Sequence, residues 1–294
     1  MTTITRSSDL DAIHWTRSLP FFAVHALALA TPFVAPVEGR WIALALGLYV
    51  VRMFGVTAGY HRYFSHRAFR TSRGFQLLLA VLGASAVQKG PLWWAAHHRD
   101  HHRHSDGPED VHSPLERGFW WSHVGWILAR RYDATKHERV KDFASFPELL
   151  WLDRWHLVVP LALAGALFLA GGLPALLWGF FVSTVLLWHG TFAINSLAHV
   201  FGRRRYETGD GSRNSLALAL VTLGEGWHNN HHFYASSAKQ GFFWWEVDVS
   251  YYVLRLLAAV RVVRDLRTPP DRVRFAHRAA GGTAPRSAAL TDAA

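Results

Sequence analysis

The chain has 294 residues and a formal net charge of +10 at pH 7, and 50% of its residues are hydrophobic, including 14 Trp and 19 Phe, which favours a membrane protein. The lack of cysteine excludes disulfides, thiolate zinc sites, iron–sulfur clusters and a thiol nucleophile, and it leaves 19 histidines as the abundant ligand type for borderline metals. No basic stripe interleaved with aromatic residues is present, so arginines at membrane edges explain the positive charge better than nucleic-acid binding does.

The first predicted membrane segment, residues 19–37, follows a short polar tail at 1–18. The tail has no small-residue cleavage site after an apolar core, so we expect it to be retained rather than removed as a signal peptide. Residues 19–37 are long enough to cross a hydrocarbon core of roughly 30 Å. Residues 41–60 then return across the membrane, with Arg52 as the single internal charge. These two segments predict a first helical hairpin.

The middle of the chain predicts one short helix and a polar region. Residues 74–87 are apolar, but at about 14 residues they are too short for a span and indicate an interfacial or buried helix. Residues 97–154 are rich in histidine, arginine and tryptophan. We expect this polar region to form the first half of a cytosolic cap.

Residues 155–171 and 174–199 predict a second hairpin. As a helix, the last segment would be about 39 Å long and would extend about two turns beyond the bilayer. Those surplus turns carry Asn195 and His199. His61 directly follows the 41–60 segment, whose helix would likewise carry it past the lipid. We therefore expect these polar residues to meet at the membrane surface. The predicted fold is an all-α integral membrane protein with four transmembrane helices in two hairpins and a cytosolic helical cap.

Arginines near the span ends indicate the orientation. Only Arg40 is expected on one side, and the other side carries Arg62, Arg67, Arg70, Arg73, Arg154, Arg203, Arg204 and Arg205. The positive-inside bias then places both termini in the cytoplasm. Residues 242–263 predict an aromatic amphipathic segment. The basic residues 267–294, rich in Ala, Arg and Pro, predict a disordered tail after a membrane domain at 19–266.

Histidine clusters carry the strongest functional signal. GEGWHNNHHF places His228, His231 and His232 at i, i+3 and i+4, so on a helix their rings face one small volume. The same spacing recurs in HHRDHH, and HRYFSH adds a looser pair. Their members are His98, His101, His102, His61 and His66. The clusters indicate a metal centre, although the pattern alone does not choose among zinc, copper, iron and nickel.

The pair His61 and His66 presents a geometric problem. Five residues correspond to about 140° around an α-helix, so the two rings would point in different directions. We therefore expect one of the pair to lie outside the helix.

The other histidines are expected to be hydrogen-bonded core or surface residues rather than ligands. They are His25, His97, His104, His112, His123, His137 and His189. Arg130 and Arg131 are equally compatible with membrane-edge anchors and with a phosphate-binding role.

The motifs HRYFSH, HRDHH, NSLAH and GEGWHNNHH, in this order and between these hairpins, resemble the integral-membrane acyl-CoA desaturases of the stearoyl-CoA type, in a bacterial form. The resemblance covers about residues 19–265 and implies a mushroom-shaped, all-helical fold in the bacterial inner membrane. It also implies a di-iron centre held by nine histidines and by a water molecule that Asn195 anchors. The matching histidines are His61, His66, His98, His101, His102, His199, His228, His231 and His232.

The resemblance implies an oxygen-dependent reaction that places a cis double bond at the ninth carbon of a saturated long-chain acyl group. Dioxygen is the co-substrate, and the electrons would come from a separate reductase or ferredoxin-like partner. An unactivated C–H bond offers no acid–base handle, so the protein must hold the chain against the metals in an apolar tunnel. Residues matching the family's lining at the bend of the acyl chain are Gln88, Trp94 and Thr191, with Arg130 and Arg131 as candidates for the headgroup. Tyr49, Met53, Thr57 and His61 recur every fourth residue, so on a continuous helix they form a row that leads from the metals into the bilayer, and we expect Tyr49 and Met53 to line the far end of the tunnel.

The sequence departs from the animal enzymes at Ala96, His97 and Phe192, where they carry arginine, aspartate or glutamate, and tryptophan. These differences leave a phospholipid-bound acyl chain open beside acyl-CoA as the substrate. A membrane di-iron hydroxylase of alkanes or lipids is an alternative, because histidine spacing separates the two activities poorly. A non-enzymatic metal transporter or haem scaffold is less favoured, because its ligands should lie within the spans.

Overall fold

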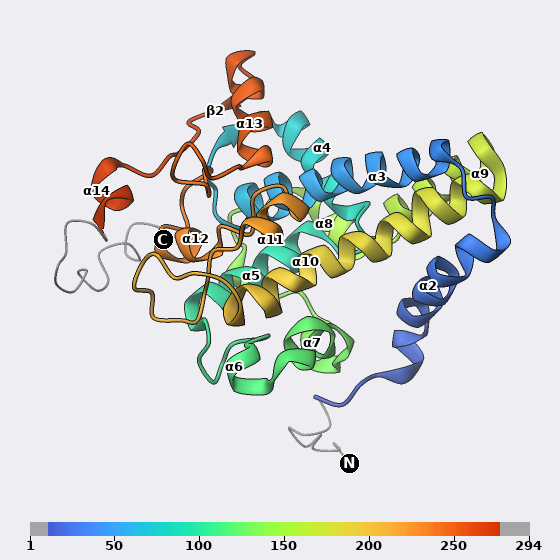
Figure 1. Cartoon of the computed structure of the whole chain (residues 1–294), viewed down its shortest axis with the longest axis horizontal. Helices are drawn as coiled ribbons and strands as arrows, with labels where there is room; N and C mark the ends of the chain where they lie inside the picture. Colours follow the sequence, from blue (N-terminus) through green and yellow to red (C-terminus); the bar gives the residue numbers. More distant parts are fainter. Residues whose placement is uncertain (1–10, 277–294) are drawn as a thin grey trace.

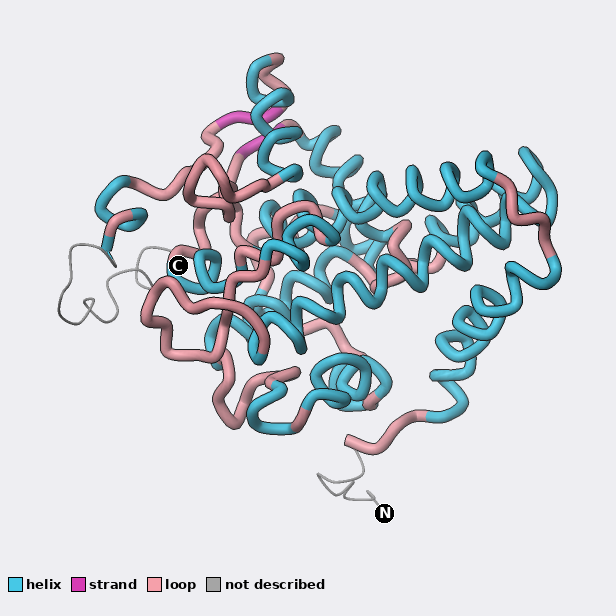
Figure 2. The backbone as a smooth tube through the Cα atoms, in the orientation of Figure 1, coloured by secondary structure: helices cyan, strands magenta, loops and turns pink. Residues whose placement is uncertain are grey.

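The computed structural model describes residues 11–276, and this part of the chain is mostly helical. Figure 1 shows three long elements extending to one side: α3 (Gly39–Phe54), α9 (Val158–Leu176) and α10 (Ser183–Val200). The short helices gather around the opposite ends of these elements, where loops are concentrated (Figure 2). The molecule is therefore divided into a long helical part and a compact cap.

The first long helix, α2 (Trp15–Val34), begins and ends earlier than the predicted segment 19–37. Its start is set by His14, whose ring accepts a hydrogen bond from the backbone N–H of Arg17 and so caps the first turn. Its end is set by extended backbone at Ala35, next to Pro36. The predicted boundary was wrong because a histidine cap has no characteristic sequence pattern.

The second long helix continues from α3 without a break into η1 (Gly55–Ser65), which is π-helical, so it extends beyond the predicted end at residue 60. The helix, Gly39–Ser65, has 27 residues. Gly55 marks the change from α to π, and a Cβ at this position would lie 2.5 Å from the carbonyl carbon of Leu82. The missing side chain therefore lets α4 (Arg73–Ala84) approach the long helix closely.

A third long stretch, Val158–Val200, runs through α9, η5 (Leu177–Val182) and α10, and it is interrupted at Gly171 and Gly172. Gly172 has φ 63° and ψ −155°, a conformation that residues with a side chain rarely adopt. This break coincides with the boundary predicted between residues 171 and 174. A Cβ at Gly179 would lie 3.3 Å from Leu167 Cδ1, so the two limbs pack against each other.

Three described helices are long and apolar enough to cross a membrane, namely Trp15–Val34, Gly39–Ser65 and Val158–Val200. Arg52 is buried among them and donates hydrogen bonds to the carbonyl of Ser85 and to the hydroxyls of Ser183 and Thr184. These hydrogen bonds stabilise the buried charge of Arg52 within an apolar helix.

The cap contains short helices and one small sheet. Strands β1 (Arg70–Thr71) and β2 (Val263–Arg264) pair antiparallel, so the prediction of an all-helical fold was wrong in this detail. The cap helices are α5 (Pro91–His104), α6 (Pro114–Arg117), η2 (Trp121–Gly125), α7 (Trp126–Leu128), η3 (Arg130–Tyr132), η4 (His137–Arg139), α8 (Pro147–Arg154), α11 (Leu216–Val221), α12 (His228–Phe233), α13 (Val249–Ala259) and α14 (Asp271–Arg274). Helix α13 fills only part of the amphipathic segment predicted at 242–263. Helix α14 lies in the predicted tail, whose residues 277–294 are outside the described part.

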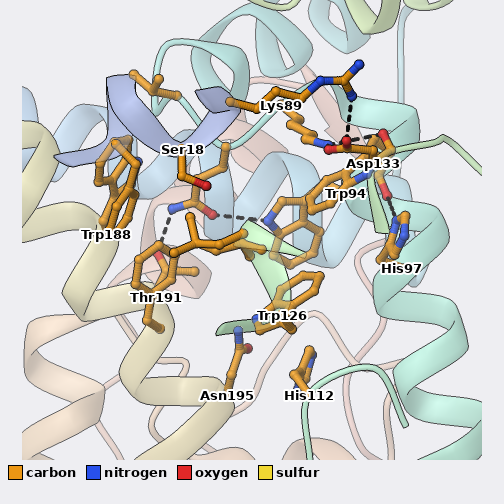
Figure 3. A pocket seen from close by; sticks show the side chains of 18 of the residues that line it. Ser18, Lys89, Trp94, His97, His112, Trp126, Asp133, Trp188, Thr191 and Asn195 are labelled. Atoms are coloured by element: carbon orange, nitrogen blue, oxygen red, sulfur yellow. Dashed lines mark hydrogen bonds and ion pairs between the residues drawn. The ribbon is translucent and has the colours of Figure 1, made fainter. Parts of the chain in front are cut away.

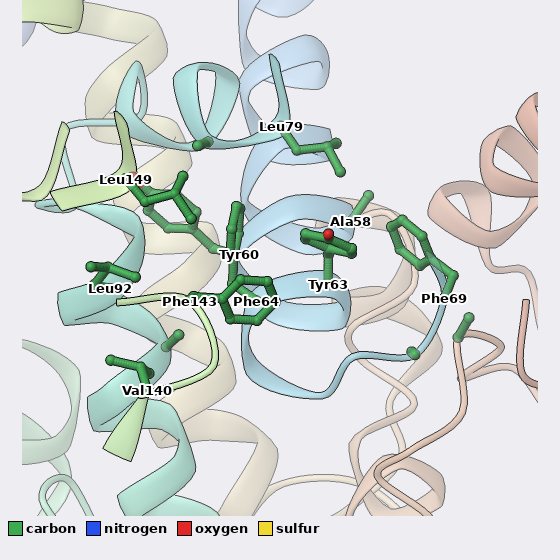
Figure 4. Close-up of a cluster of buried hydrophobic side chains, with 14 of the residues drawn as sticks. Ala58, Tyr60, Tyr63, Phe64, Phe69, Leu79, Leu92, Val140, Phe143 and Leu149 are labelled. Atoms are coloured by element: carbon green, nitrogen blue, oxygen red, sulfur yellow. The ribbon is translucent and has the colours of Figure 1, made fainter. Parts of the chain in front are cut away.

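A buried aromatic cluster joins the long helix to the cap (Figure 4). Tyr60, Tyr63 and Phe64 of η1 pack with Leu92 of α5 and with Phe143. Phe64 and Phe143 meet edge to face, with ring centroids 5.0 Å apart. The cluster therefore fixes η1 against α5, and these are two of the elements that carry the histidine clusters.

Candidate metal centre

The π-helix η1 resolves the geometric problem of His61 and His66. A π-helix closes its hydrogen bonds one residue later than an α-helix, so residues five apart come close to one face. The backbone N–H of His66 donates to the carbonyl of His61 at 3.2 Å, and the ring centroids are 4.8 Å apart. His66 lies just after the last π-helical residue. Both rings therefore reach the same site.

All nine predicted histidines meet in two groups, in each of which the ligand atoms lie within 4.8 Å of one another. The group of five contains His61, His66, His98, His102 and His231, and the group of four contains His101, His199, His228 and His232. Helices α5 and α12 each contribute to both groups. The two groups are in contact, because the rings of His102 and His232 stack with centroids 4.5 Å apart.

Ring nitrogens face one another inside each group. The Nε2–Nε2 distance is 2.9 Å between His66 and His98 and 3.0 Å between His61 and His231. A metal bound by imidazoles at about 2.1 Å, with bonds at right angles, separates neighbouring nitrogens by about 3.0 Å. In the group of four, the buried Nε2 atoms of His101 and His232 have no hydrogen-bond partner within residues 11–276. Both groups therefore fit a metal ion.

Three aspartates fix the rings of the group of four. His101 Nδ1–H donates to Asp110 at 2.9 Å, and His199 Nδ1–H donates to Asp106 at 2.7 Å. His232 Nδ1–H donates to Asp210 at 2.6 Å. Each bond leaves the Nε2 lone pair free to bind a metal. These aspartates were not predictable from the sequence, because they lie on loops without periodicity.

In the group of five, His61 pairs with the buried Glu225. The same carboxylate accepts from Arg62 at 2.9 Å, and Arg62 also pairs with Asp248 at 2.9 Å. Burial opposes the charged form of Glu225, but His61 and Arg62 outweigh it and lower the pKa of this carboxyl to about 2. Glu225 therefore stays negative beside the group of five.

Burial keeps most of the grouped histidines neutral. It is the largest cause that lowers the pKa values well below the ordinary range for His66, His98, His102, His228 and His231, and neighbouring imidazoles add to it. Burial lowers the pKa of His232 to about 4, although Asp210 favours the charged ring. For His101, burial also disfavours the charge, but Asp110 outweighs it and raises the pKa. Neutral imidazole is the form that binds metals.

An outer cavity of about 260 Å³ leads to the two histidine groups (Figure 3). Three predicted substrate residues line it and bind one another: Gln88 donates to Thr191 at 3.1 Å, and the Trp94 indole donates to Gln88 at 3.2 Å. Trp94 also stacks on His98, with ring centroids 4.9 Å apart. The side chains matched to the bend in the substrate therefore lie directly beside the group of five.

A smaller inner cavity of about 40 Å³ continues beyond the two histidine groups and is lined by Met53, Thr57 and His61. Asn195 lines both cavities, and it shares the inner one with His101 and His228 of the group of four. Tyr49 lines neither cavity, and its hydroxyl donates to the carbonyl of Val221 at 2.6 Å.

The remaining candidates lie at the periphery. Arg130 and Arg131 line neither cavity. Arg130 donates to the His14 ring at 2.9 Å, and Arg131 pairs with Asp11 at 2.7 Å. His112, for which no functional role was predicted, is buried in the wall of the outer cavity, with its ring centroid 4.2 Å from that of His101. The position of His112 beside His101 depends on the fold of the loop after α5, which no sequence motif indicated.

Comparisons with known proteins agree with this geometry. A family model described as fatty acid desaturase matches residues 39–274. The chain is 37% identical over 267 residues to an sn-2 palmitoyl-lipid 9-desaturase of Nostoc sp. (strain 36), which covers 88% of this chain and 92% of that one. It is 38% identical over 253 residues to a palmitoyl-monogalactosyldiacylglycerol delta-7 desaturase of Arabidopsis thaliana, with coverage of 85% and 67%. It is 36% identical over 251 residues to an acyl-CoA 5-desaturase of Anemone leveillei, with coverage of 84% and 78%.

Proposed function

The chain belongs to the fatty acid desaturase family and is an oxidoreductase, and we propose that it places a cis double bond at the ninth carbon of saturated long-chain acyl groups. The observation that carries this proposal is the position of two histidine groups where an apolar outer cavity meets a smaller inner one. An acyl chain that passes from one cavity to the other would present its middle carbons to both groups.

The nine histidines are the proposed ligands of two iron ions, with Asn195 holding a water molecule at the group of four. When bound, the two ions would supply the oxidising chemistry with dioxygen. The overall reaction converts –CH2–CH2–, dioxygen, two electrons and two protons into –CH=CH– and two water molecules. The protein holds the acyl chain and excludes bulk water, and burial keeps most of the imidazoles neutral.

The bonded trio Gln88, Trp94 and Thr191 is the proposed positioning device for the reacting carbons. Because these side chains hold one another, the cavity wall beside His98 is rigid and the acyl chain must follow its shape. Arg130 and Arg131 stay proposed contacts for a headgroup phosphate. A separate reductase or ferredoxin-like protein is the proposed electron donor, docking on the basic cap.

Four membrane crossings, with the cap and both termini in the cytoplasm, complete the proposal. The break at Gly171 and Gly172 supports two crossings within the stretch Val158–Val200. Reporter proteins fused after Arg70, Arg205 and the C-terminus should all give cytoplasmic signals. A periplasmic signal from any of them would exclude this topology.

The reaction is tested by expressing the chain in a host with a defined saturated lipid pool and by analysing its fatty acids. We expect new unsaturated chains with the double bond at the ninth carbon. Hydroxylated chains in place of alkenes would favour the hydroxylase alternative. Metal uptake without any change in the lipids would favour a non-enzymatic metal-binding role.

A further inference from the structure

One wall of the outer cavity is a single helix. Ser18, Phe21 and Val24 of α2 line the cavity, while Leu19 on the opposite face is 63% exposed. Helix α2 is among the helices able to span a membrane, so its exposed face would contact hydrocarbon. An acyl chain in the cavity is therefore separated from the bilayer by the thickness of one helix.

The boundary between α2 and α10 is closed by two side-chain contacts. Phe21 stacks on Trp188, with ring centroids 5.2 Å apart and 11° between the planes. His25 Nε2 lies 3.2 Å from His189 Nε2, and His189 is exposed at the outer edge. Figure 3 shows Ser18 and Trp188 on this side of the cavity. We name this boundary the α2–α10 seam.

The pair at the seam ends a chain of three histidines. His25 Nδ1 lies 2.8 Å from the carbonyl oxygen of Phe21, His189 Nδ1 lies 3.0 Å from His123 Nε2, and His123 Nδ1 lies 2.9 Å from Ser196 Oγ. The carbonyl only accepts, so the proton of a neutral His25 is on Nδ1 and its Nε2 accepts from His189. The Ser196 hydroxyl lies 2.9 Å from both the Phe192 carbonyl oxygen and His123 Nδ1. When it donates to His123, His123 donates to His189 and His189 donates to His25, so three neutral rings satisfy every ring nitrogen.

Opening the seam would break the hydrogen bond between His25 and His189, at the outer end of this row of histidines. The Nε2–H of His189 and the lone pair of His25 would then face hydrocarbon, which offers no hydrogen-bond partner. The cytoplasmic end of α2 is held separately, because the backbone N–H of His14 donates to the carbonyl of Leu128 at 3.0 Å and Arg17 pairs with Asp133 at 2.7 Å. The histidine pair therefore acts where α2 has no other polar link to α10 within the described residues.

We propose that α2 is a lateral gate between the bilayer and the outer cavity, that His25 and His189 latch it, and that the substrates are acyl chains of membrane glycerolipids. This inference rests on the proposed desaturase function. A lipid-linked chain already lies in hydrocarbon, and it would reach the cavity through the seam without passing through water. Moving the same chain through water would cost about 0.8 kcal/mol for each CH2 group.

The test uses the natural lack of cysteine in the chain. The double variant His25→Cys, His189→Cys is reconstituted in vesicles of saturated phosphatidylglycerol, and its thiols are joined by a short bis-methanethiosulfonate. We expect the link to reduce desaturation of the vesicle lipid by about tenfold or more, while added stearoyl-CoA is still converted and a reductant restores the lipid reaction. Each single-cysteine variant, treated with the same reagent, is the matched control.

An unchanged lipid rate after linking would overturn the gate, and a parallel loss with both substrates would overturn its specificity for lipids. A wild-type chain that desaturates neither substrate would instead overturn the proposed function itself. If the double variant does not fold, His189→Phe keeps a ring without nitrogens and should raise the lipid rate by about threefold relative to stearoyl-CoA. Leu29→Phe, on the exposed face of α2, is its control. An equal change in both variants would exclude the latch.

Discussion

The two histidine groups differ in how their rings are held. In the group of four, His101, His199 and His232 each have an aspartate partner, whereas in the group of five only His61 pairs with a carboxylate of the described residues 11–276. A carboxylate that accepts from Nδ1–H fixes the ring and makes it a more basic ligand. The group with fewer nitrogens therefore has more negative charge behind them, so two unequal ligand sets can each hold a metal ion.

Removing one ligand from each group gives the largest expected effect. His228→Ala leaves three nitrogens in the group of four, and His66→Ala leaves four in the group of five. We expect both variants to lose desaturation entirely, and His228→Ala to lose more bound metal because fewer ligands remain. Metal content per chain and fatty-acid unsaturation measure the two effects.

The control for these variants is His137→Ala, which removes an exposed histidine outside both groups. It should keep wild-type metal content and activity. Full metal content together with normal activity in His228→Ala would contradict the assignment of the group of four. The same outcome in His231→Ala would contradict the assignment of the group of five.

Changing the carboxylates separates metal binding from folding. Asp210→Asn should weaken metal affinity or activity by about 10- to 100-fold, because His232 loses the charge behind its ring. Glu225→Gln should do the same and also destabilise the fold by about 3–5 kcal/mol, because Arg62 loses a buried partner. Metal titration and thermal unfolding measure the two variants. Equal unfolding temperatures for both would show that the Glu225–Arg62 pair has no structural role.

Acid should destabilise the metal-free protein. The pKa of His232 is lowered to about 4 in the fold, compared with about 6.5 when unfolded, so between these values the unfolded chain binds more protons. The contribution of His232 to the free energy of unfolding is fully present above about pH 6.5 and is lost as the pH falls toward 4. The buried His66, His98 and His231 act in the same direction, and His101, with a raised pKa, acts in the opposite one.

Thermal unfolding of the chelated protein between pH 7.5 and 5 measures this effect, and the unfolding temperature should fall steadily below about pH 6.5. The metal-bound protein should resist acid over more of this range, because bound metal competes with protons for the imidazoles. A metal-free protein that is equally stable at both ends of the range would contradict burial as the dominant influence on these rings.

The histidine spacings were predictable because HxxHH places rings on one helical face, whatever the rest of the fold. Their division into two groups was not, because α5 and α12 each supply both groups and only packing decides which ring belongs where. The expectation that one of His61 and His66 lies outside the helix was confirmed, because His66 follows the last π-helical residue, but the π-helix itself depends on close packing at Gly55, which periodicity does not reveal. The helix break at Gly171 and Gly172 coincides with the boundary predicted between residues 171 and 174, because paired glycines are a local signal.

The smallest expected effect concerns chain length and lies at the inner cavity. The sequence predicted a row of Tyr49, Met53, Thr57 and His61 leading away from the metals. The last three line the cavity, while Tyr49 lies beyond it with its hydroxyl bound to the carbonyl of Val221. A Cβ at Gly190 would lie 3.1 Å from Met53 Cε, so the methionine fills the space against α10. We therefore propose that Met53 limits the length of the acyl chain.

Met53→Ala removes roughly three side-chain atoms and should shift the preferred substrate by about two carbons toward longer chains. The double bond should stay at the same carbon counted from the carboxyl end, because the outer cavity and the metal groups are unchanged. Truncating a buried methionine costs about 2–5 kcal/mol of stability, so thermal unfolding must first show that the variant is folded. Met53→Leu conserves the volume and should keep the wild-type chain-length distribution. An unchanged product distribution from folded Met53→Ala, measured against a mixture of saturated chains, would mean that Met53 only packs between the helices and that the chain ends elsewhere.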